Sequence, residues 1–268
     1  MKSNYRYIVK AFMAMAVIAG TTSCDDFLDR EPMSSISPET YYSTAAQLEA
    51  NLNDEYPNVL PSFGQWTYGI FGEDKGTDNQ IEVNANDRYT QDRWKVPHSE
   101  SDNWKFERIY RINFFLSEAL PKFGEDMSGS QNTISGSVAT IKHYIGEMYF
   151  LRAYEYFKKL QLFGDFPIID QPLADEMEAL REASKRFPRN EVARFIISDL
   201  DKAYAYMSDV DMATTRINKD AAMLVKSRVA LFEATWLQNF KGTAFVPGGE
   251  GWPGAVSYTH LRAHETDS

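Results

Sequence analysis

The sequence contains little material for covalent or metal chemistry. Among its 268 residues there are one cysteine, Cys24, and four histidines. A single thiol excludes an internal disulfide. There is no phosphate-cradling glycine loop, no HExxH and no Gly-x-Ser-x-Gly, so the usual signatures of nucleotide-binding proteins, zinc peptidases and serine hydrolases are absent. We therefore expect no cofactor, no metal site and no enzymatic activity.

Long apolar runs are also missing. The only one near the N-terminus, residues 11–20, has about half of the ~20 residues that a transmembrane helix needs. Lys2, Arg6 and Lys10 precede it and small residues follow it, as in a signal peptide over residues 1–23. Cys24 comes next, either as a chance cysteine near an ordinary cleavage site or as the acylated residue of a lipobox. Several acyl chains on one cysteine would form a stable membrane anchor.

Basic residues are outnumbered by acidic ones in the remaining chain. The formal net charge is −10, and it becomes −12 without the +3 of residues 1–23 and the −1 of residues 256–268. An acidic body of this kind argues against binding to nucleic acid and against electrostatic docking on anionic lipid. Aromatic residues make up 14% of the sequence, which suits stacking on flat ligands as well as filling of a core.

The apolar residues recur with a helical period, and period-two strands are nearly absent. We predict helices from Thr44, in capping-box spacing with Gln47, to Pro57; over 104–120; over 138–163, ended by Gly164; after an N-cap at Asn190; and after an N-cap at Asn218. The expected buried stripes are Ala45, Leu48, Leu52 and Tyr56; Phe106, Ile109, Tyr110, Asn113, Leu116 and Leu120; Tyr149, Ala153, Tyr156, Phe157 and Leu160; Val192, Phe195, Ile196, Leu200, Ala203 and Met207; and Ala221, Leu224, Val225, Val229, Phe232 and Trp236.

Small residues on the third helix indicate how the helices pack. Gly146 and Ala153 share one stripe, which would let a neighbouring helix approach closely. Helices with such notches and aromatic fillers are typical of tetratricopeptide-like pairs. We therefore predict an all-α fold of tetratricopeptide-like helical pairs, with long loops inserted at 57–103, 124–136 and 168–189.

The first long loop offers the residue types that bind sugars. Pyranose rings stack on aromatic faces while carboxylate, amide and guanidinium groups bond to their hydroxyls. An equally good interpretation is that these aromatics only hold the loop on the helices. The candidates for glycan binding are Trp66, Tyr68, Asp74, Asp78, Asn84, Arg88, Tyr89 and Trp94.

Several segments together resemble one family. They are Ser23 to Asp29 with Pro32, "NWKFERIYRINFFL", "GEMYFLRAYEYFKKLQLFGDFPI" and "NKDAAMLVKSRVALFEATW". The chain resembles the SusD/RagB family of surface glycan-binding lipoproteins, which favours lipidation of Cys24. The resemblance implies a helical-repeat protein on the outer membrane, anchored by its N-terminal lipid and exposed at the surface. It also implies that the protein binds an oligosaccharide and passes it to a SusC-like TonB-dependent transporter without catalysis.

The family resemblance implies further local roles. Asp25, Asp26 and Asp29 look like a surface-export signal, although an ordinary acidic tether is the alternative. Arg152 and Arg228 are expected to form buried ion pairs. An exported scaffold that binds only protein, and a glycoside-active enzyme, remain as other functions.

The end of the chain departs from the helical pattern. Residues 256–266 resemble a translated sequencing adapter, so we expect residues 256–268 to be foreign and residues 24–255 to be the N-terminal portion of a longer family protein. His260 and His264 stand at the i, i+4 spacing of a metal site, but they fall within this tail.

Overall fold

The computed structural model describes residues 41–61, 103–124, 126–208, 212 and 215–246. The helices of these described residues all lie in one compact unit. The helices are α3 (Ala45–Val59), α4 (Glu107–Phe123), α5 (Val138–Phe163), α6 (Met177–Ala183), α7 (Arg189–Tyr206) and α8 (Lys219–Phe240). Within the described residues only isolated β-bridges occur, such as Phe166 with Phe187. The prediction of an all-α fold is confirmed.

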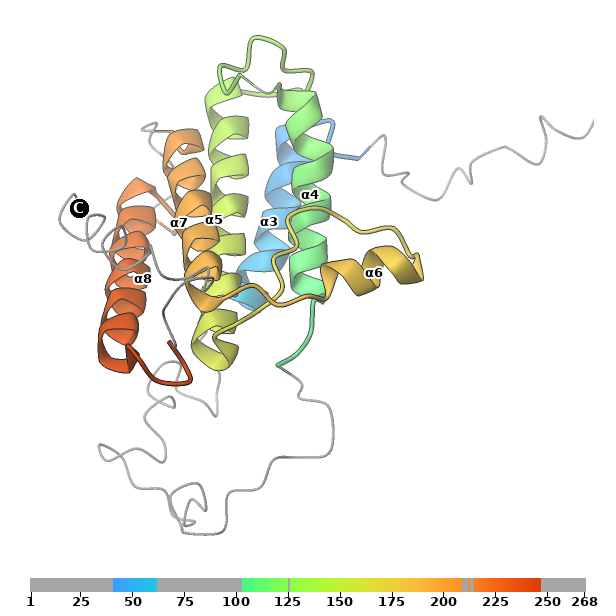
Figure 1. Cartoon of the computed structure of the whole chain (residues 1–268). Helices are drawn as coiled ribbons and strands as arrows, with labels where there is room; N and C mark the ends of the chain where they lie inside the picture. The colour runs from blue at the N-terminus through green and yellow to red at the C-terminus, as the bar shows by residue number, and fades with distance from the viewer. Residues whose placement is uncertain (1–40, 62–102, 125, 209–211, 213–214, 247–268) are drawn as a thin grey trace, which may run out of the picture. The chain divides into compact units, whose positions relative to one another are not determined.

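Helix α5 lies at the centre of the unit and runs alongside its neighbours (Figure 1). It packs against α3, α4 and α7, while α8 packs mainly on α7. Short α6 projects from the long connection between α5 and α7 and has no buried residue (Figure 1). In the part of the chain that the structure describes, no helix is both long and apolar enough to cross a bilayer.

Two predicted helix starts are confirmed in detail. The Thr44 side chain accepts from the Gln47 backbone N–H, and the Gln47 side chain accepts from the Thr44 backbone N–H, so the predicted capping box is complete. The Asn218 side chain accepts from the Ala221 N–H at 2.9 Å and begins α8. Each of these caps satisfies backbone donors that have no partner within the helix.

Other boundaries were predicted wrongly. Helix α3 continues past Pro57, because the Leu60 N–H still bonds to the Tyr56 carbonyl at 2.9 Å and closes the last turn. Helix α4 begins and ends about one turn later than predicted. The N-cap of α7 is Pro188, and Asn190 lies inside the first turn.

The close contact predicted at Gly146 is confirmed. A Cβ placed on Gly146 would lie 2.9 Å from the Ala203 carbonyl oxygen and 2.9 Å from the Met207 backbone nitrogen. Ala153 is also fully buried. The missing side chain at Gly146 therefore sets how closely α7 can approach α5.

The predicted buried face of α8 is correct at Val229, which is buried, and wrong at Leu224. Leu224, expected in the core, is 72% exposed, and the buried residues are Ala222, Val229, Ala230, Glu233, Ala234 and Leu237. Small alanines face the neighbouring helix, and a bidentate ion pair between Glu233 and Arg189 of α7 fixes the register, with Arg189 Nη2 at 2.8 Å from Glu233 Oε2. Apolar side chains occur on every side of α8, so their spacing alone did not identify the contact face.

Candidate ligand site

The predicted functional residues lie outside the described residues. This applies to Cys24, to all eight glycan-binding candidates between Trp66 and Trp94, and to His260 and His264. The structure does describe both ends of the segment that carries the glycan-binding candidates, at residues 59–61 and at Asn103.

Two consecutive lysines of α5 hold these two ends. Lys158 Nζ donates to the Val59 carbonyl oxygen at 2.9 Å, and Lys159 Nζ donates to the Asn103 carbonyl oxygen at 2.6 Å. The C-terminal part of α5 therefore fixes where the chain leaves α3 and where it returns before α4.

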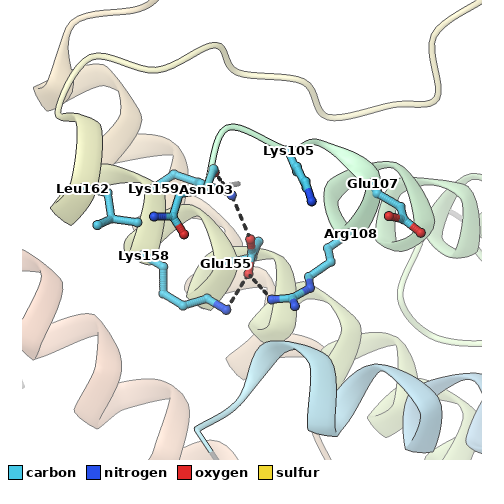
Figure 2. Close-up of a pocket in the computed structure, with 8 residues that line it drawn as sticks. All are labelled: Asn103, Lys105, Glu107, Arg108, Glu155, Lys158, Lys159 and Leu162. Carbon is cyan, nitrogen blue, oxygen red and sulfur yellow. Dashed lines mark hydrogen bonds and ion pairs between the residues drawn. The ribbon is translucent and has the colours of Figure 1, made fainter. Parts of the chain in front are cut away.

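A cleft with a cavity of about 300 Å³ lies beside these contacts (Figure 2). Its floor carries Glu155, whose side chain is 4% exposed. Lys158 Nζ lies 2.6 Å from Glu155 Oε2, Lys159 Nζ lies 3.3 Å from Oε1, and Arg108 Nη1 lies 3.9 Å from Oε2. The lining residues are Asn103, Lys105, Glu107, Arg108, Glu155, Lys158, Lys159 and Leu162.

The lining of this cleft is cationic. Four of its side chains are basic and two are acidic, although the chain as a whole has a formal charge of −10. Guanidinium and ammonium groups are the donors that proteins use for carboxylate and sulfate or phosphate oxygens. The cleft therefore has the chemistry of a site for an anion.

A second hollow of about 320 Å³ lies between α4, residues 169–175 and α6. Phe106, Ile109 and Leu180 give it an apolar lining. Tyr110, which the helical period predicts in the core, is 51% exposed and lines this hollow instead. Its ring lies near that of Phe114, with 6.2 Å between centroids, on the outer side of α4.

A polar network holds the segment that forms one wall of this hollow. Arg152 bonds to both carboxylate oxygens of Asp199, at 2.6 and 2.8 Å, and its Nη1 donates to Asn113 Oδ1 and to the Asp170 carbonyl oxygen, each at 2.9 Å. Tyr156 exchanges two hydrogen bonds with the backbone of Ile169. Burial raises the pKa of the Tyr156 phenol well above its ordinary value, which keeps it a donor.

These contacts test two sequence predictions. The predicted buried ion pair of Arg152 is confirmed, and the buried Asn113 has the partners that it requires. Arg228 is exposed, so its predicted burial is wrong. The residue that forms the second buried arginine pair is Arg189, at the start of α7.

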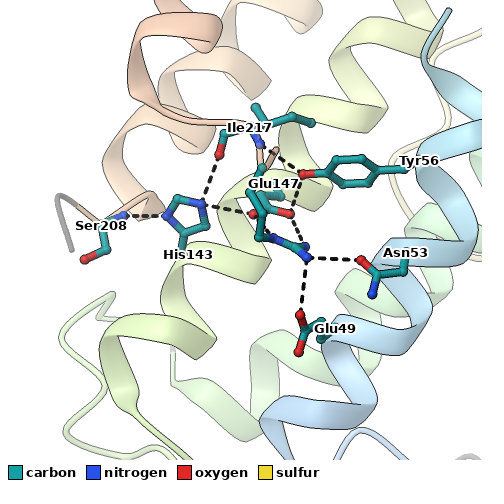
Figure 3. Close-up of polar contacts among 8 residues, drawn as sticks. Glu49, Asn53, Tyr56, His143, Glu147, Ser208 and Ile217 are labelled. Carbon is teal, nitrogen blue, oxygen red and sulfur yellow. Dashed lines mark hydrogen bonds and ion pairs between the residues drawn. The ribbon is translucent and has the colours of Figure 1, made fainter. Parts of the chain in front are cut away.

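A further network surrounds His143, which looked isolated in the sequence (Figure 3). Its Nδ1 accepts the Ser208 backbone N–H at 3.2 Å. Its Nε2 lies 3.0 Å from Glu147 Oε1 and 3.0 Å from the Ile217 carbonyl oxygen. Since Nδ1 accepts, the hydrogen of the neutral ring is assigned to Nε2, which donates to these oxygens.

The other side of Glu147 is also occupied. Tyr56 donates to Glu147 Oε2 at 2.8 Å, and Arg216 Nε donates to Oε1 at 2.7 Å. Burial, together with the Glu147 charge, raises the pKa of the Tyr56 phenol well above its ordinary value. The network joins α3, α5 and the segment before α8. With His143 and Glu147 at its centre both buried and paired in this way, its role is structural.

No group of three or more His, Cys, Asp or Glu side chains gathers as metal ligands would among residues 41–61, 103–124, 126–208, 212 and 215–246.

Comparison with known proteins places these features in context. The profile of a SusD-like family described as "Starch-binding associating with outer membrane" matches residues 26–231. SusD-like protein P2 of Formosa agariphila is 25% identical over 257 residues, covering 91% of this chain and 46% of the relative. SusD-like protein P25 of the same organism is 25% identical over 233 residues, covering 80% and 41%.

A solved structure has a similar fold. A SusD-like carbohydrate-binding protein from Bacteroides fragilis superposes with a TM-score of 0.50 at 18% identity, over 76% of this chain and 40% of that one. This chain spans less than half the length of these relatives.

Proposed function

This chain belongs to the SusD-like family, and from that premise we propose that it is an outer-membrane lipoprotein that binds oligosaccharides and delivers them to a SusC-like TonB-dependent transporter. The observation that carries the proposal is the family match over residues 26–231. The helical unit supports it, because α5 holds both described ends of the segment that carries the glycan-binding candidates. On this proposal the protein binds glycans and does not cleave them.

Glycan binding is tested with the purified chain and a panel of oligosaccharides, measured by isothermal titration calorimetry. Trp66→Ala and Trp94→Ala should each weaken binding at least about tenfold, because stacked aromatic rings contribute much of the affinity for sugars. Tyr204→Ala is the matched control, since Tyr204 is a 43% exposed aromatic on α7. A chain that binds no glycan would favour the alternative of an exported scaffold that binds only protein, and release of shortened products would favour a glycoside-active enzyme.

The anchor is tested separately at Cys24. Labelled palmitate should enter the wild-type protein and leave Cys24→Ala unlabelled, and the variant should leave the membrane fraction. A variant that still takes up label and stays with the membrane would contradict lipidation at this residue.

The division of the chain is also a proposal: a signal peptide over 1–23, a SusD-like N-terminal portion over 24–255, and a foreign tail over 256–268. Resequencing of intact genomic DNA tests it. A reading frame that continues beyond residue 255 with further helical sequence supports the proposal, and a native stop codon directly after Ser268 contradicts it.

A further inference from the structure

The cationic cleft between α4 and α5 has more positive charge than its contacts within the cleft neutralise. Arg108, Lys158 and Lys159 all face Glu155, the one carboxylate on the floor of the cleft. Arg108 is also attracted by the buried Glu55, which pairs with Arg111 and does not line the cleft. The remaining charged residues of the lining, Lys105 and Glu107, are of opposite sign. A partly enclosed cleft with a net positive lining concentrates anions.

The donors of these cations are only partly used. Lys158 and Lys159 each bond to one backbone carbonyl and to Glu155, and an ammonium group has three N–H donors. Arg108 is 48% exposed, and its closest guanidinium nitrogen lies 3.9 Å from Glu155, beyond hydrogen-bond length. Arg108 donates no hydrogen bond to any residue that the structure describes.

Among the described residues, Arg108 therefore offers the cleft a planar fork of donors that no hydrogen bond uses. Figure 2 shows its guanidinium turned into the cleft, toward the buried Glu155. Arginine recognises carboxylates, sulfates and phosphates through pairs of parallel hydrogen bonds. The buried Lys159 and the half-buried Lys158 would add charge, while Glu155 holds their ammonium groups in place.

We propose that this cleft binds an oxyanion carried by the glycan, either the carboxylate of a uronic acid or a sulfate ester. The cavity of about 300 Å³ is large enough for one charged sugar unit. The inference rests on the proposed glycan binding and adds a substrate class, acidic oligosaccharides. The acidic surface elsewhere would repel such a ligand, which leaves the cleft as the favourable place for its charge.

The test compares three oligosaccharides of equal length on the purified chain by calorimetry: an oligogalacturonide, a sulfated galactan fragment and a neutral maltooligosaccharide. At least one acidic ligand should bind more tightly than the neutral one, and its affinity should fall as salt is raised. Arg108→Gln should weaken binding of that acidic ligand about tenfold and leave neutral binding unchanged, and Arg108→Lys should weaken it less. The acidic ligand whose affinity falls in Arg108→Gln identifies the oxyanion: a carboxylate for the oligogalacturonide and a sulfate ester for the sulfated fragment.

The matched control is Arg194→Gln, which removes the same charge from α7, a helix that contributes no residue to the cleft. Equal affinity of the wild type and Arg108→Gln for every acidic ligand overturns the inference. Binding of the neutral ligand alone also overturns it and leaves the proposed glycan binding intact. Absence of binding to any glycan overturns both, and an unchanged melting temperature of Arg108→Gln excludes misfolding as the cause of a loss.

Discussion

Helices α5 and α8 are both rich in apolar residues, but they are used in different ways. α5 buries 17 of its 26 residues, whereas α8 buries six of 22. The difference follows from position: α5 has α3, α4 and α7 around it, and α8 packs mainly on α7 (Figure 1). A helix with neighbours on several sides buries most of its residues. A helix that packs mainly on one neighbour buries the residues of one face.

The polar residues of the two helices show the same contrast. α5 buries His143, Glu147, Arg152, Glu155 and Lys159, and each has a named partner. Among its charged residues α8 buries only Glu233, which pairs with Arg189. Buried charges cost free energy unless they are paired, so each pair specifies which helix must be the neighbour.

The largest expected effect comes from breaking a pair of the central helix. Asp199→Ala leaves Arg152 charged and buried, so the free energy of unfolding should fall by about 3 to 5 kcal/mol. Arg228→Ala, at an exposed arginine of α8, should change it by about 0.5 kcal/mol or less. Urea denaturation followed by circular dichroism measures both. Equal urea denaturation midpoints for the two variants would mean that the buried ion pair of α5 contributes no more to stability than an exposed charge of α8.

A second effect probes the close packing of α5. Gly146→Ala should lower the free energy of unfolding by about 1 to 3 kcal/mol, because its new Cβ would meet backbone atoms of Ala203 and Met207 at 2.9 Å. Helix propensity acts in the opposite direction by about 1 kcal/mol. Thr235→Ala, at an exposed position of α8, is the control and should not destabilise the protein. A Gly146→Ala protein as stable as the wild type in thermal melts would mean that α7 can move away without cost.

This contrast also explains what the sequence could predict. The positions of the main helices, the Thr44 and Asn218 caps and the notch at Gly146 are local or periodic features, and they were predicted correctly. The buried face of α8 was predicted only in part: Leu224 and Val229 were both expected in the core, but only Val229 is buried. Both are apolar, and only the neighbouring helix decides between them. The prediction that Tyr110 of α4 is buried was wrong for the same reason.

The cleft was not predicted at all. Its cations come from α4, from α5 and from the residues before α4, and no spacing in the sequence links Arg108 with Lys158 and Lys159. The adjacent lysines were the one available signal, since a charged pair inside an apolar helix requires partners. The His143 network was missed likewise, because its partners are far away in the chain.

A smaller effect depends on pH. Burial raises the pKa of Glu233 above 4.5, while Arg189 lowers it and offsets part of the shift. The folded state therefore holds this proton more tightly than the unfolded chain. The stability gained in this way is complete below pH 4.5 and is lost as pH rises through the raised pKa.

The non-titrating variant Glu233→Gln should thus become more stable relative to the wild type as pH rises from 4.5. Urea denaturation at a series of pH values measures the difference. A difference that shrinks with rising pH would mean that the attraction of Arg189 outweighs the burial.

The smallest effect is expected on the outer face of α8. Leu224 is 72% exposed, so Leu224→Ala should change the free energy of unfolding by about 0.5 kcal/mol or less. Leu237→Ala removes the same atoms from a 3% exposed position on the same helix and should cost about 2 to 5 kcal/mol. Both substitutions have the same change in helix propensity, so urea denaturation isolates burial. If Leu224→Ala cost as much as Leu237→Ala, a second face of α8 would be covered, and α8 would resemble α5 in being packed from more than one side.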